Sequence, residues 1–368
     1  MQYDTVIHVG GREISLAAPT YFVADIASNH DGDLEKAKHL IYLAKEAGAD
    51  AVKFQHFLAD KIVSDYGFRE LGGQVGHQAS WKQSVYDVFR ACECKRSWSE
   101  ELARTAADAG IDFLTTPYDA EAVEQLDRYI PAYKIGSGDI TWTSFIRLIA
   151  GKGRPVFLAT GASTMADVER AVAAVLAANR QLVLMQCNTN YTGSLENFHC
   201  INLNVLKTYA VRYPGMVLGL SDHTPGHATV LGAIALGARV IEKHFPADNK
   251  LIGPDHPFSM NPKTWREMVD RSRELEQALG TGTKIVEANE QETVVVQRRA
   301  LHAAHDIAAG TVLQAGDIEA LRPAPVGAFL PYEEDLVVGR TAAHDMKRGA
   351  AIHPADLAPA ERKEAPSC

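Results

Sequence analysis

Two histidines late in the chain could together hold a metal ion. His223 and His244 each close a polar triplet after a short apolar run, Ser-Asp-His in one case and Glu-Lys-His in the other. Their spacing of 21 residues matches one strand–helix–strand step, which would bring both imidazoles to the same end of a parallel sheet. Paired imidazoles there suit Mn²⁺, Mg²⁺ or Zn²⁺, with Asp222, Glu242 or Asp255 as further ligands or as groups that orient the ligands. A purely structural role is the alternative for each histidine.

Two lysines lie inside apolar runs. Lys53 is flanked by valine and phenylalanine, and Lys134 by tyrosine and isoleucine. A lysine in a buried strand is costly unless it faces a pocket or an anion, so the pair could bracket a phosphate or a carboxylate. The alternative is that each side chain extends its ammonium to the rim.

The composition excludes several classes of protein. The formal net charge is −9, which disfavours non-specific nucleic-acid binding. The N-terminal segment lacks the basic-then-apolar pattern of a secretion signal. No apolar run approaches the ~18 residues that span a membrane. Five cysteines at irregular spacing do not indicate a disulfide framework. We therefore expect a cytoplasmic protein that binds neither nucleic acid nor membrane.

Strand-like runs alternate with alanine-rich helical segments through most of the chain. Eight such runs predict a (β/α)8 TIM barrel, preceded by a β-hairpin in residues 1–20. A doubly wound sheet is the alternative, but Ala27–His30 is not the glycine-rich phosphate turn that it requires. Ser99 is expected to cap the helix 99–109 at its N-terminus. The predicted strands are Tyr21–Ala27, Ala51–Gln55, Ile111–Thr115, Ala132–Ile135, Val156–Ala159, Leu182–Gln186, Val217–Leu220 and Val240–Glu242.

Polar residues close nearly every predicted strand, where barrel enzymes carry their chemistry. An insertion at 58–98, rich in glycine, glutamine and aromatic residues, is expected to shape the mouth of the barrel. Gly136-Ser137-Gly138 could present backbone N–H groups to a phosphate. The strand-end residues, beyond those already named, are Asp25, Asn29, Gln55, Thr115, Thr116, Ser137, Thr160, Asn188, Thr189 and Ser221.

The pattern changes after residue 280. We expect a barrel domain with its hairpin at 1–282, a charged linker at 283–294, a small β-rich domain at 295–358 and a tail at 359–368. The small domain contains an internal repeat, because Asp306, Gly310 and Asp317 recur as aspartate, glycine and aspartate 39 positions later. A pseudo-symmetric pair of strand-and-turn units is therefore predicted.

In this order and spacing, the motifs resemble those of the sialic acid synthase family, the phosphoenolpyruvate-dependent nonulosonate synthases. The likeness covers about residues 15–358 and includes a C-terminal antifreeze-like SAF domain. The motifs that carry it are Asn29-His30-Asp31-Gly32, Val52-Lys53-Phe54-Gln55, Thr116-Pro117-Tyr118-Asp119, Tyr133-Lys134-Ile135-Gly136-Ser137-Gly138, Gly219-Leu220-Ser221-Asp222-His223-Thr224, Ile241-Glu242-Lys243-His244-Phe245, Gly253-Pro254-Asp255, Phe258-Ser259-Met260, Gln297-Arg298-Arg299 and Leu321-Arg322-Pro323.

The resemblance implies a reaction. Phosphoenolpyruvate would condense with the open-chain aldehyde of an N-acyl hexosamine, giving phosphate and a nine-carbon 2-keto sugar acid. A divalent metal, typically Mn²⁺, would be held by His223 and His244. The SAF domain of one subunit would cover the barrel of the other in a domain-swapped homodimer, where Arg322 touches the N-acyl group. The residues expected to act in catalysis are Asp25, Lys53, Lys134, Asp222 and Glu242.

Two departures from the family pattern concern the acceptor sugar. Asp25 stands where the family usually has glutamate, and the sixth-strand motif keeps Tyr191 but has Thr192 where a proline is usual. N-acetylmannosamine and a modified hexose of the legionaminic or pseudaminic type both remain open as acceptors. A metal-dependent barrel aldolase or isomerase acting on a phosphosugar is the alternative enzyme, and a sugar- or ice-binding protein the non-catalytic one.

Overall fold

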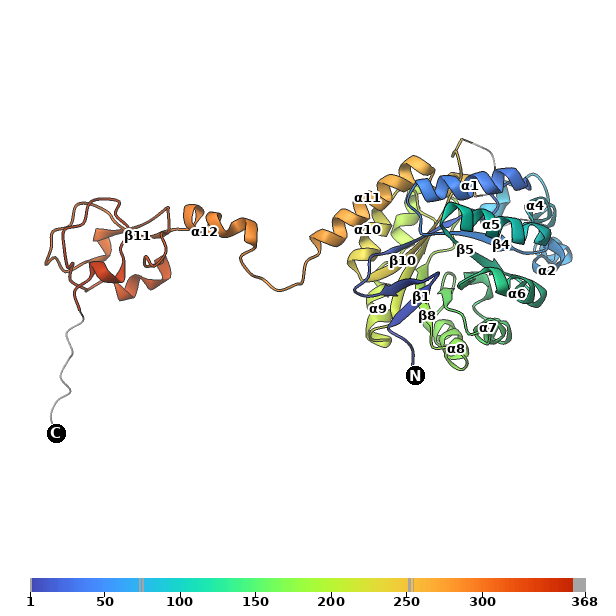
Figure 1. The fold of residues 1–368 in the computed structure, drawn as a ribbon, viewed down its shortest axis with the longest axis horizontal. Helices are drawn as coiled ribbons and strands as arrows, with labels where there is room; N and C mark the ends of the chain where they lie inside the picture. The colour runs from blue at the N-terminus through green and yellow to red at the C-terminus, as the bar shows by residue number, and fades with distance from the viewer. Residues whose placement is uncertain (1, 73, 75, 251–252, 254, 360–368) are drawn as a thin grey trace. The chain divides into compact units, whose positions relative to one another are not determined.

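The chain folds into two compact units, Met1–Gly280 and Thr281–Cys368, in a computed structural model (Figure 1). The structure describes residues 2–72, 74, 76–250, 253 and 255–359. Apart from Pro359, the expected tail therefore lies outside the described residues. Within these ranges no helix is long and apolar enough to cross a membrane.

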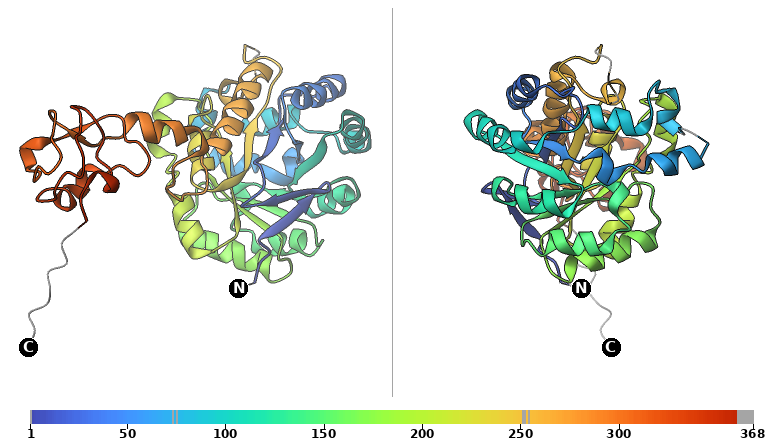
Figure 2. Two further views of the ribbon diagram at one scale, coloured as in Figure 1. Left: turned by 60° about the vertical axis from the view of Figure 1, so that its left-hand side comes forward. Right: turned by 90° about the vertical axis from the view of Figure 1, so that its right-hand side faces the viewer.

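The first unit is a closed barrel of eight parallel strands, ordered β10-β3-β4-β5-β6-β7-β8-β9. This confirms the predicted barrel, and every strand lies within two residues of its predicted ends. Helices surround the strands (Figure 2). The strands are β3 Tyr21–Asp25, β4 Ala51–His56, β5 Asp112–Pro117, β6 Tyr133–Ile135, β7 Val156–Ala159, β8 Leu182–Cys187, β9 Val217–Asp222 and β10 Ala238–His244.

The helices begin and end at recognisable local signals. Asp33 caps α1, its side chain accepting hydrogen bonds from the backbone N–H groups of Glu35 and Lys36, and Gly110 ends α5 in the left-handed conformation at φ +67°. The barrel helices are α1 Leu34–Glu46, α5 Ser99–Ala109, α6 Ala120–Leu126, α7 Thr143–Ala150, α8 Met165–Leu176, α9 Val205–Arg212, α10 Ala228–Ala235 and α11 Pro262–Ala278.

Ser99 is not the N-cap that its sequence context predicts. The chain enters α5 through a 3₁₀ turn at Arg96–Trp98, so Ser99 already has helical dihedral angles. Its hydroxyl donates to the Arg96 carbonyl over 2.8 Å and lies 3.2 Å from His56 Nε2. Ser99 therefore helps to fix a buried histidine behind β4.

Alternate side chains of each strand face the barrel interior, and the others face the helices. The interior core contains Val23, Phe157, Met185 and Val217. The hairpin of β1 (Val6–Val9) and β2 (Arg12–Ser15) contributes Ile7, Val9 and Ile14 to the same core. It thereby closes the amino-terminal end of the barrel and leaves the opposite end as the open one.

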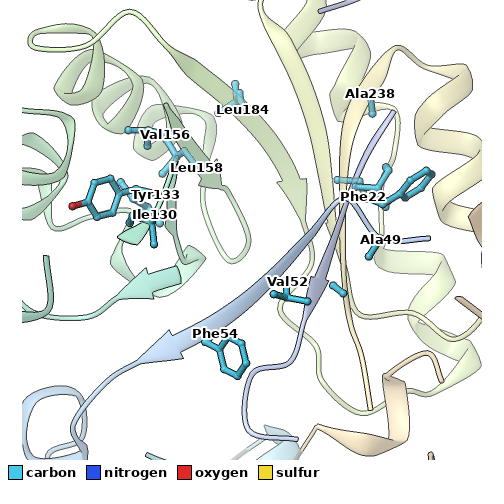
Figure 3. Packing of buried hydrophobic residues seen from close by; sticks show 14 of the residues in the cluster. Phe22, Ala49, Val52, Phe54, Ile130, Tyr133, Val156, Leu158, Leu184 and Ala238 are labelled. Carbon is cyan, nitrogen blue, oxygen red and sulfur yellow. The ribbon is translucent and has the colours of Figure 1, made fainter. Parts of the chain in front are cut away.

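The outer core holds the helices against the strands. Phe22, Val52, Phe54 and Leu158 point outward into it (Figure 3), and Trp265 of α11 is fully buried there. Each such side chain contributes roughly 1.5–3 kcal/mol by its burial. Fixed strands and helices in turn fix where the strand ends lie.

The insertion after β4 folds into short helices: α2 Ala59–Ile62, α3 Asp65–Glu70 and α4 Val85–Ala91. Phe57 packs on Phe89 with ring centroids 5.3 Å apart, which ties α4 to the end of β4. The insertion is thus anchored beside the open end of the barrel, where the sequence predicted it.

The second unit confirms the predicted internal repeat. The Asp306 carboxylate accepts from the Arg348 backbone N–H over 2.9 Å, and the Asp345 carboxylate accepts from the Ala309 N–H over 2.8 Å. These two contacts exchange under the 39-residue shift, as a pseudo-twofold pair must. The unit contains β11 Ala300–Ala303 and β12 Ile318–Leu321. The helix α12 (Gln291–Gln297) begins inside the stretch expected to be a linker.

Gly219 is a point where the barrel interior tolerates no side chain. A Cβ there would lie 2.7 Å from the Val240 carbonyl oxygen and 2.9 Å from Met185 Cγ. We expect Gly219→Ala to destabilise the barrel by about 1–3 kcal/mol, measured as a lower urea midpoint. Gly138→Ala is the matched control, because a Cβ at Gly138 meets nothing within 4 Å. Equal midpoints for the two variants would contradict this packing.

Candidate active site

The inward-facing strand ends meet in an inner cavity with about 320 Å³ of empty space. Every strand except β7 brings a polar side chain to it, directly or from the residues just after the strand. Among the described residues, the predicted site residues that line this inner cavity are Asp25, Lys53, Gln55, Thr116, Lys134, Ser137, Tyr191, Ser221, His223, Glu242 and His244.

Two lysines and two carboxylates neutralise one another in the inner cavity. Lys53 Nζ lies 2.6 Å from Asp25 Oδ2 and 3.6 Å from Glu242 Oε1, and Lys134 Nζ lies 2.8 Å from the same Glu242 oxygen. All four side chains are almost fully buried. Such a group is tolerated in a protein interior only because the charges are paired.

These contacts set the charge states. Burial opposes ionisation of Glu242, but Lys134 and Lys53 outweigh it and lower its pKa to about 2. Burial likewise disfavours the charged form of Lys53, yet Asp25 and Glu242 raise its pKa. Near neutral pH the cavity therefore presents charged ammonium groups beside a carboxylate. Glu242 Oε2 is buried and has no hydrogen-bond partner among the described residues.

The two histidines lie side by side, with ring centroids 5.2 Å apart. His223 Nδ1 donates to the Asn188 carbonyl over 2.8 Å, which leaves Nε2 as its unprotonated nitrogen. Burial and the neighbouring His244 lower the pKa of His223 to about 4. Tyr191 packs on His223 at 4.3 Å, and Phe258 meets His244 at 5.0 Å. The imidazoles are thus held rigidly, and His223 is neutral.

This donor set fits a divalent metal. A ligating histidine characteristically donates its other N–H to a carbonyl, as His223 does to Asn188. His244 Nδ1 is buried without a hydrogen-bond partner among the described residues, and Asp255 Oδ2 lies 3.8 Å from it. Within the described ranges, no group of three or more His, Cys, Asp or Glu side chains is close enough to hold an ion. The two imidazoles would therefore need a small shift of a carboxylate, or water, to complete a coordination shell.

A larger outer cavity, with about 980 Å³ of empty space, adjoins the inner one and shares Gln55, Tyr118, Ser137, Tyr191 and His244 with it. Asp255, a predicted site residue, lines this outer cavity and accepts hydrogen bonds from the side chain and backbone of Ser28. Much of its wall comes from the insertion, as expected. Those wall residues are Ile62, Gln78, Trp81, Val88, Phe89 and Cys92.

Three predicted site residues face away from the cavities. The Asp222 carboxylate is bound by Lys243, Thr224 and Thr229 on the outer side of β9 and β10. Thr115 bonds His56 Nδ1 over 2.7 Å, and Thr160 bonds the Met185 carbonyl over 2.9 Å. The physical reason is strand alternation, because each follows or precedes an inward-facing residue. A catalytic role for Asp222 is thus not supported by its position.

Four other predicted residues lie beside the cavities or in the other unit. Asn29 is fully buried and donates to the Phe245 carbonyl and the Ser259 hydroxyl. Asn188 and Thr189 line a separate surface hollow with Asn190, although the Asn188 carbonyl orients His223. Arg322 is an exposed residue of the second unit, just after β12.

The sequence reasoning missed Tyr118, Cys187 and Phe258. Tyr118 and Cys187 line the inner cavity, and Phe258 packs on both histidines. Alternation could have found the first two, because Tyr118 is two residues after Thr116 and Cys187 two residues after the interior Met185. Phe258 comes from the loop after β10, and no periodic pattern marks it.

The Asp222–Lys243 pair is a buried ion pair outside the cavities, so it should act on stability. We expect Asp222→Leu to cost about 3–5 kcal/mol of unfolding free energy, because Lys243 is left charged and unpaired. Adding Lys243→Met should recover most of that loss, measured by urea unfolding. Loss of turnover by the folded double variant would contradict this assignment and restore a catalytic role to Asp222.

Comparison with known proteins agrees with this geometry. Residues 40–284 match the NeuB family, and residues 298–358 match the SAF domain. The family, the barrel fold and the C-terminal SAF domain expected from the motifs are thereby confirmed.

Individual relatives align over nearly the whole chain. An uncharacterized protein of Methanocaldococcus jannaschii is 35% identical over 86% of this chain and 89% of its own length. The N,N'-diacetyllegionaminic acid synthase of Legionella pneumophila is 32% identical over 90% of this chain and 93% of its own. The structure of N-acetylneuraminic acid synthetase from Leptospira borgpetersenii aligns with a TM-score of 0.68 at 26% identity, over 80% of this chain and 96% of that one. The chain belongs to the NeuB family and is a carbon–carbon bond-forming synthase of the nonulosonate type.

Proposed function

We propose that the chain condenses phosphoenolpyruvate with the open-chain aldehyde of an N-acyl hexosamine, N-acetylmannosamine or a modified analogue. The products are a nine-carbon 2-keto sugar acid and phosphate. The observation that carries this proposal is a lysine-containing inner cavity that opens, past two histidines, into a larger outer cavity. The alternative of a metal-dependent aldolase or isomerase acting on a phosphosugar is not favoured, since the named relatives are nonulosonate synthases.

Phosphoenolpyruvate belongs in the inner cavity. It carries a phosphate and a carboxylate close together, and Lys53 and Lys134 come from different strands to the same space. Among the described residues Lys134 donates to Glu242 alone, so two of its three N–H donors remain for a ligand. Ser137, with the backbone of Gly136 and Gly138, adds uncharged donors beside it.

The acceptor aldehyde belongs at the junction of the two cavities, beside His244. There the enol carbon of phosphoenolpyruvate forms a bond to the aldehyde carbon, and negative charge develops on the aldehyde oxygen. A divalent metal held by His223 and His244, which we propose to be Mn²⁺ with Mg²⁺ possible in its place, supplies Lewis-acid stabilisation of that charge. Tyr191 and Phe258 pack on the imidazoles and hold them in place.

Water must then add at the phosphate-bearing carbon, after which the bond from that carbon to the bridging oxygen breaks and phosphate leaves. Glu242 is suited to accept the proton of this water, because it stays ionised and its Oε2 has no partner within the described part of the chain. Asp25 is held by Lys53 and Gln55 and keeps their donors in position.

We further propose a cytoplasmic homodimer in which the SAF domain of one subunit covers the barrel of the other. The proposal rests on the family membership, on the exposed position of Arg322 and on the absence of disulfides among the described cysteines. Arg322 of the partner subunit would contact the N-acyl group of the acceptor.

The reaction is tested by measuring phosphate release from phosphoenolpyruvate with a panel of N-acyl hexosamines and recording product masses. We expect release only when an acceptor aldose is present and metal is bound. His223→Ala and His244→Ala should each lower the rate roughly 100-fold or more, because the developing oxyanion loses its stabilisation. Release that a chelator or both substitutions leave unchanged would contradict the metal role, and turnover of a phosphosugar without phosphoenolpyruvate would contradict the synthase.

The swapped lid is tested by mixing two inactive variants. In a swapped heterodimer of a His223→Ala chain and an Arg322→Ala chain, one site combines an intact barrel with an intact arginine. We expect activity to return on mixing and the protein to have twice its mass of 40.0 kDa by light scattering. Arg348→Ala, another exposed arginine of the second unit, serves as the control for Arg322→Ala. A fully active monomer, or no recovery on mixing, would contradict the swap.

A further inference from the structure

Positive charge is distributed unevenly between the two cavities. Lys53 and Lys134 both line the inner cavity, whereas the described residues that line the outer cavity include no lysine or arginine. The only acidic side chain on that wall is Asp255. A phosphate group in the outer cavity would therefore lose water without gaining a cation, and it would face a carboxylate.

The outer cavity instead has an aromatic and aliphatic wall. Trp81 packs near Phe89 with ring centroids 6.5 Å apart, Phe89 near Phe57 at 5.3 Å, and Phe57 near Tyr118 at 5.9 Å. Ile62 and Val88 extend this surface. Aromatic rings and branched aliphatic groups favour methyl, methylene and acyl groups over charged ones.

The position of this wall relates it to one end of the acceptor. His244 lines both cavities, whereas Phe57, Trp81 and Phe89 line only the outer one. If the aldehyde lies at His244, as the proposed function requires, the rest of the sugar extends toward the insertion. The wall therefore meets the acceptor carbons remote from the aldehyde.

We propose that the acceptor is an unphosphorylated N-acyl hexose that carries apolar substituents at the end remote from its aldehyde, such as a methyl group at C6 and an acylamido group at C4. Trp81, Phe89 and Val88 of the insertion are then specificity-determining residues. This inference rests on the proposed function and narrows its substrate class.

Three acceptors with the same acetamido group at C2 decide between the possibilities: one with a C6 hydroxyl, its 6-phosphate, and a 6-deoxy form with a second acetamido group at C4. We expect the 6-deoxy diacetamido acceptor to have the highest kcat/KM, about 10-fold or more above the hydroxyl form. The 6-phosphate should be lowest, by roughly 100-fold or more. The full-length chain is used, so that any cation supplied by a partner subunit is present.

A pair of substitutions on α4 tests the wall itself. Val88→Lys places a cation at the cavity and should reduce the preference for the diacetamido acceptor over the 6-phosphate by about 10-fold or more. Ala91→Lys adds the same charge at an exposed position of α4 that does not line the cavity, and should leave the ratio unchanged.

The outcomes separate the two proposals. If none of the three acceptors supports phosphate release, the proposed function fails and this inference fails with it. If the 6-phosphate or the 6-hydroxyl acceptor has the highest kcat/KM, the synthase stands and the inference is overturned. The wild-type panel decides this even if Val88→Lys does not fold.

Discussion

The site depends on the burial of four opposite charges at the open end of the barrel. Lys53, Lys134, Asp25 and Glu242 come from four different strands, and each needs the others to remain charged in an interior with little water. Such a group is stable only when the strands that carry it are fixed in register. The closed barrel fixes them, with the hairpin filling its opposite end. An anionic substrate can then enter a space where the cations are already in place, which reduces the cost of organising the site.

How much of this could be predicted depended on which kind of pattern carried the information. Strand runs and their order were readable because hydrophobic periodicity is local, and the two lysines stood out because a lysine between apolar residues needs a reason. The facing direction of strand-end residues was also available, but it was not applied. Asp222 lies between Ser221 and His223, so it must face the helices when they face the cavity. Thr115 and Thr160 were misplaced for the same reason.

Other features were beyond a local pattern. Phe258 packs on both histidines from a loop whose path follows from tertiary packing, and no spacing in the sequence announces it. The pairing of Glu242 with two lysines from separate strands also requires the closed barrel, since the three residues are far apart in the chain. The insertion was expected at the mouth, yet its aromatic sequence of Trp81, Phe89 and Phe57 became visible only in the fold.

The division between a cationic inner cavity and an uncharged outer one gives each substrate its own place, and the reacting atoms meet between them. The most direct test of this account uses phosphoenolpyruvate labelled with ¹⁸O at the bridging oxygen, together with an accepted N-acyl hexose. The account predicts a new sugar acid three carbons longer than the acceptor, with the label in the released phosphate, because water adds at carbon and the carbon–oxygen bond breaks. Unlabelled phosphate with the label retained in the sugar acid, or release of phosphate without a new sugar acid, would contradict it.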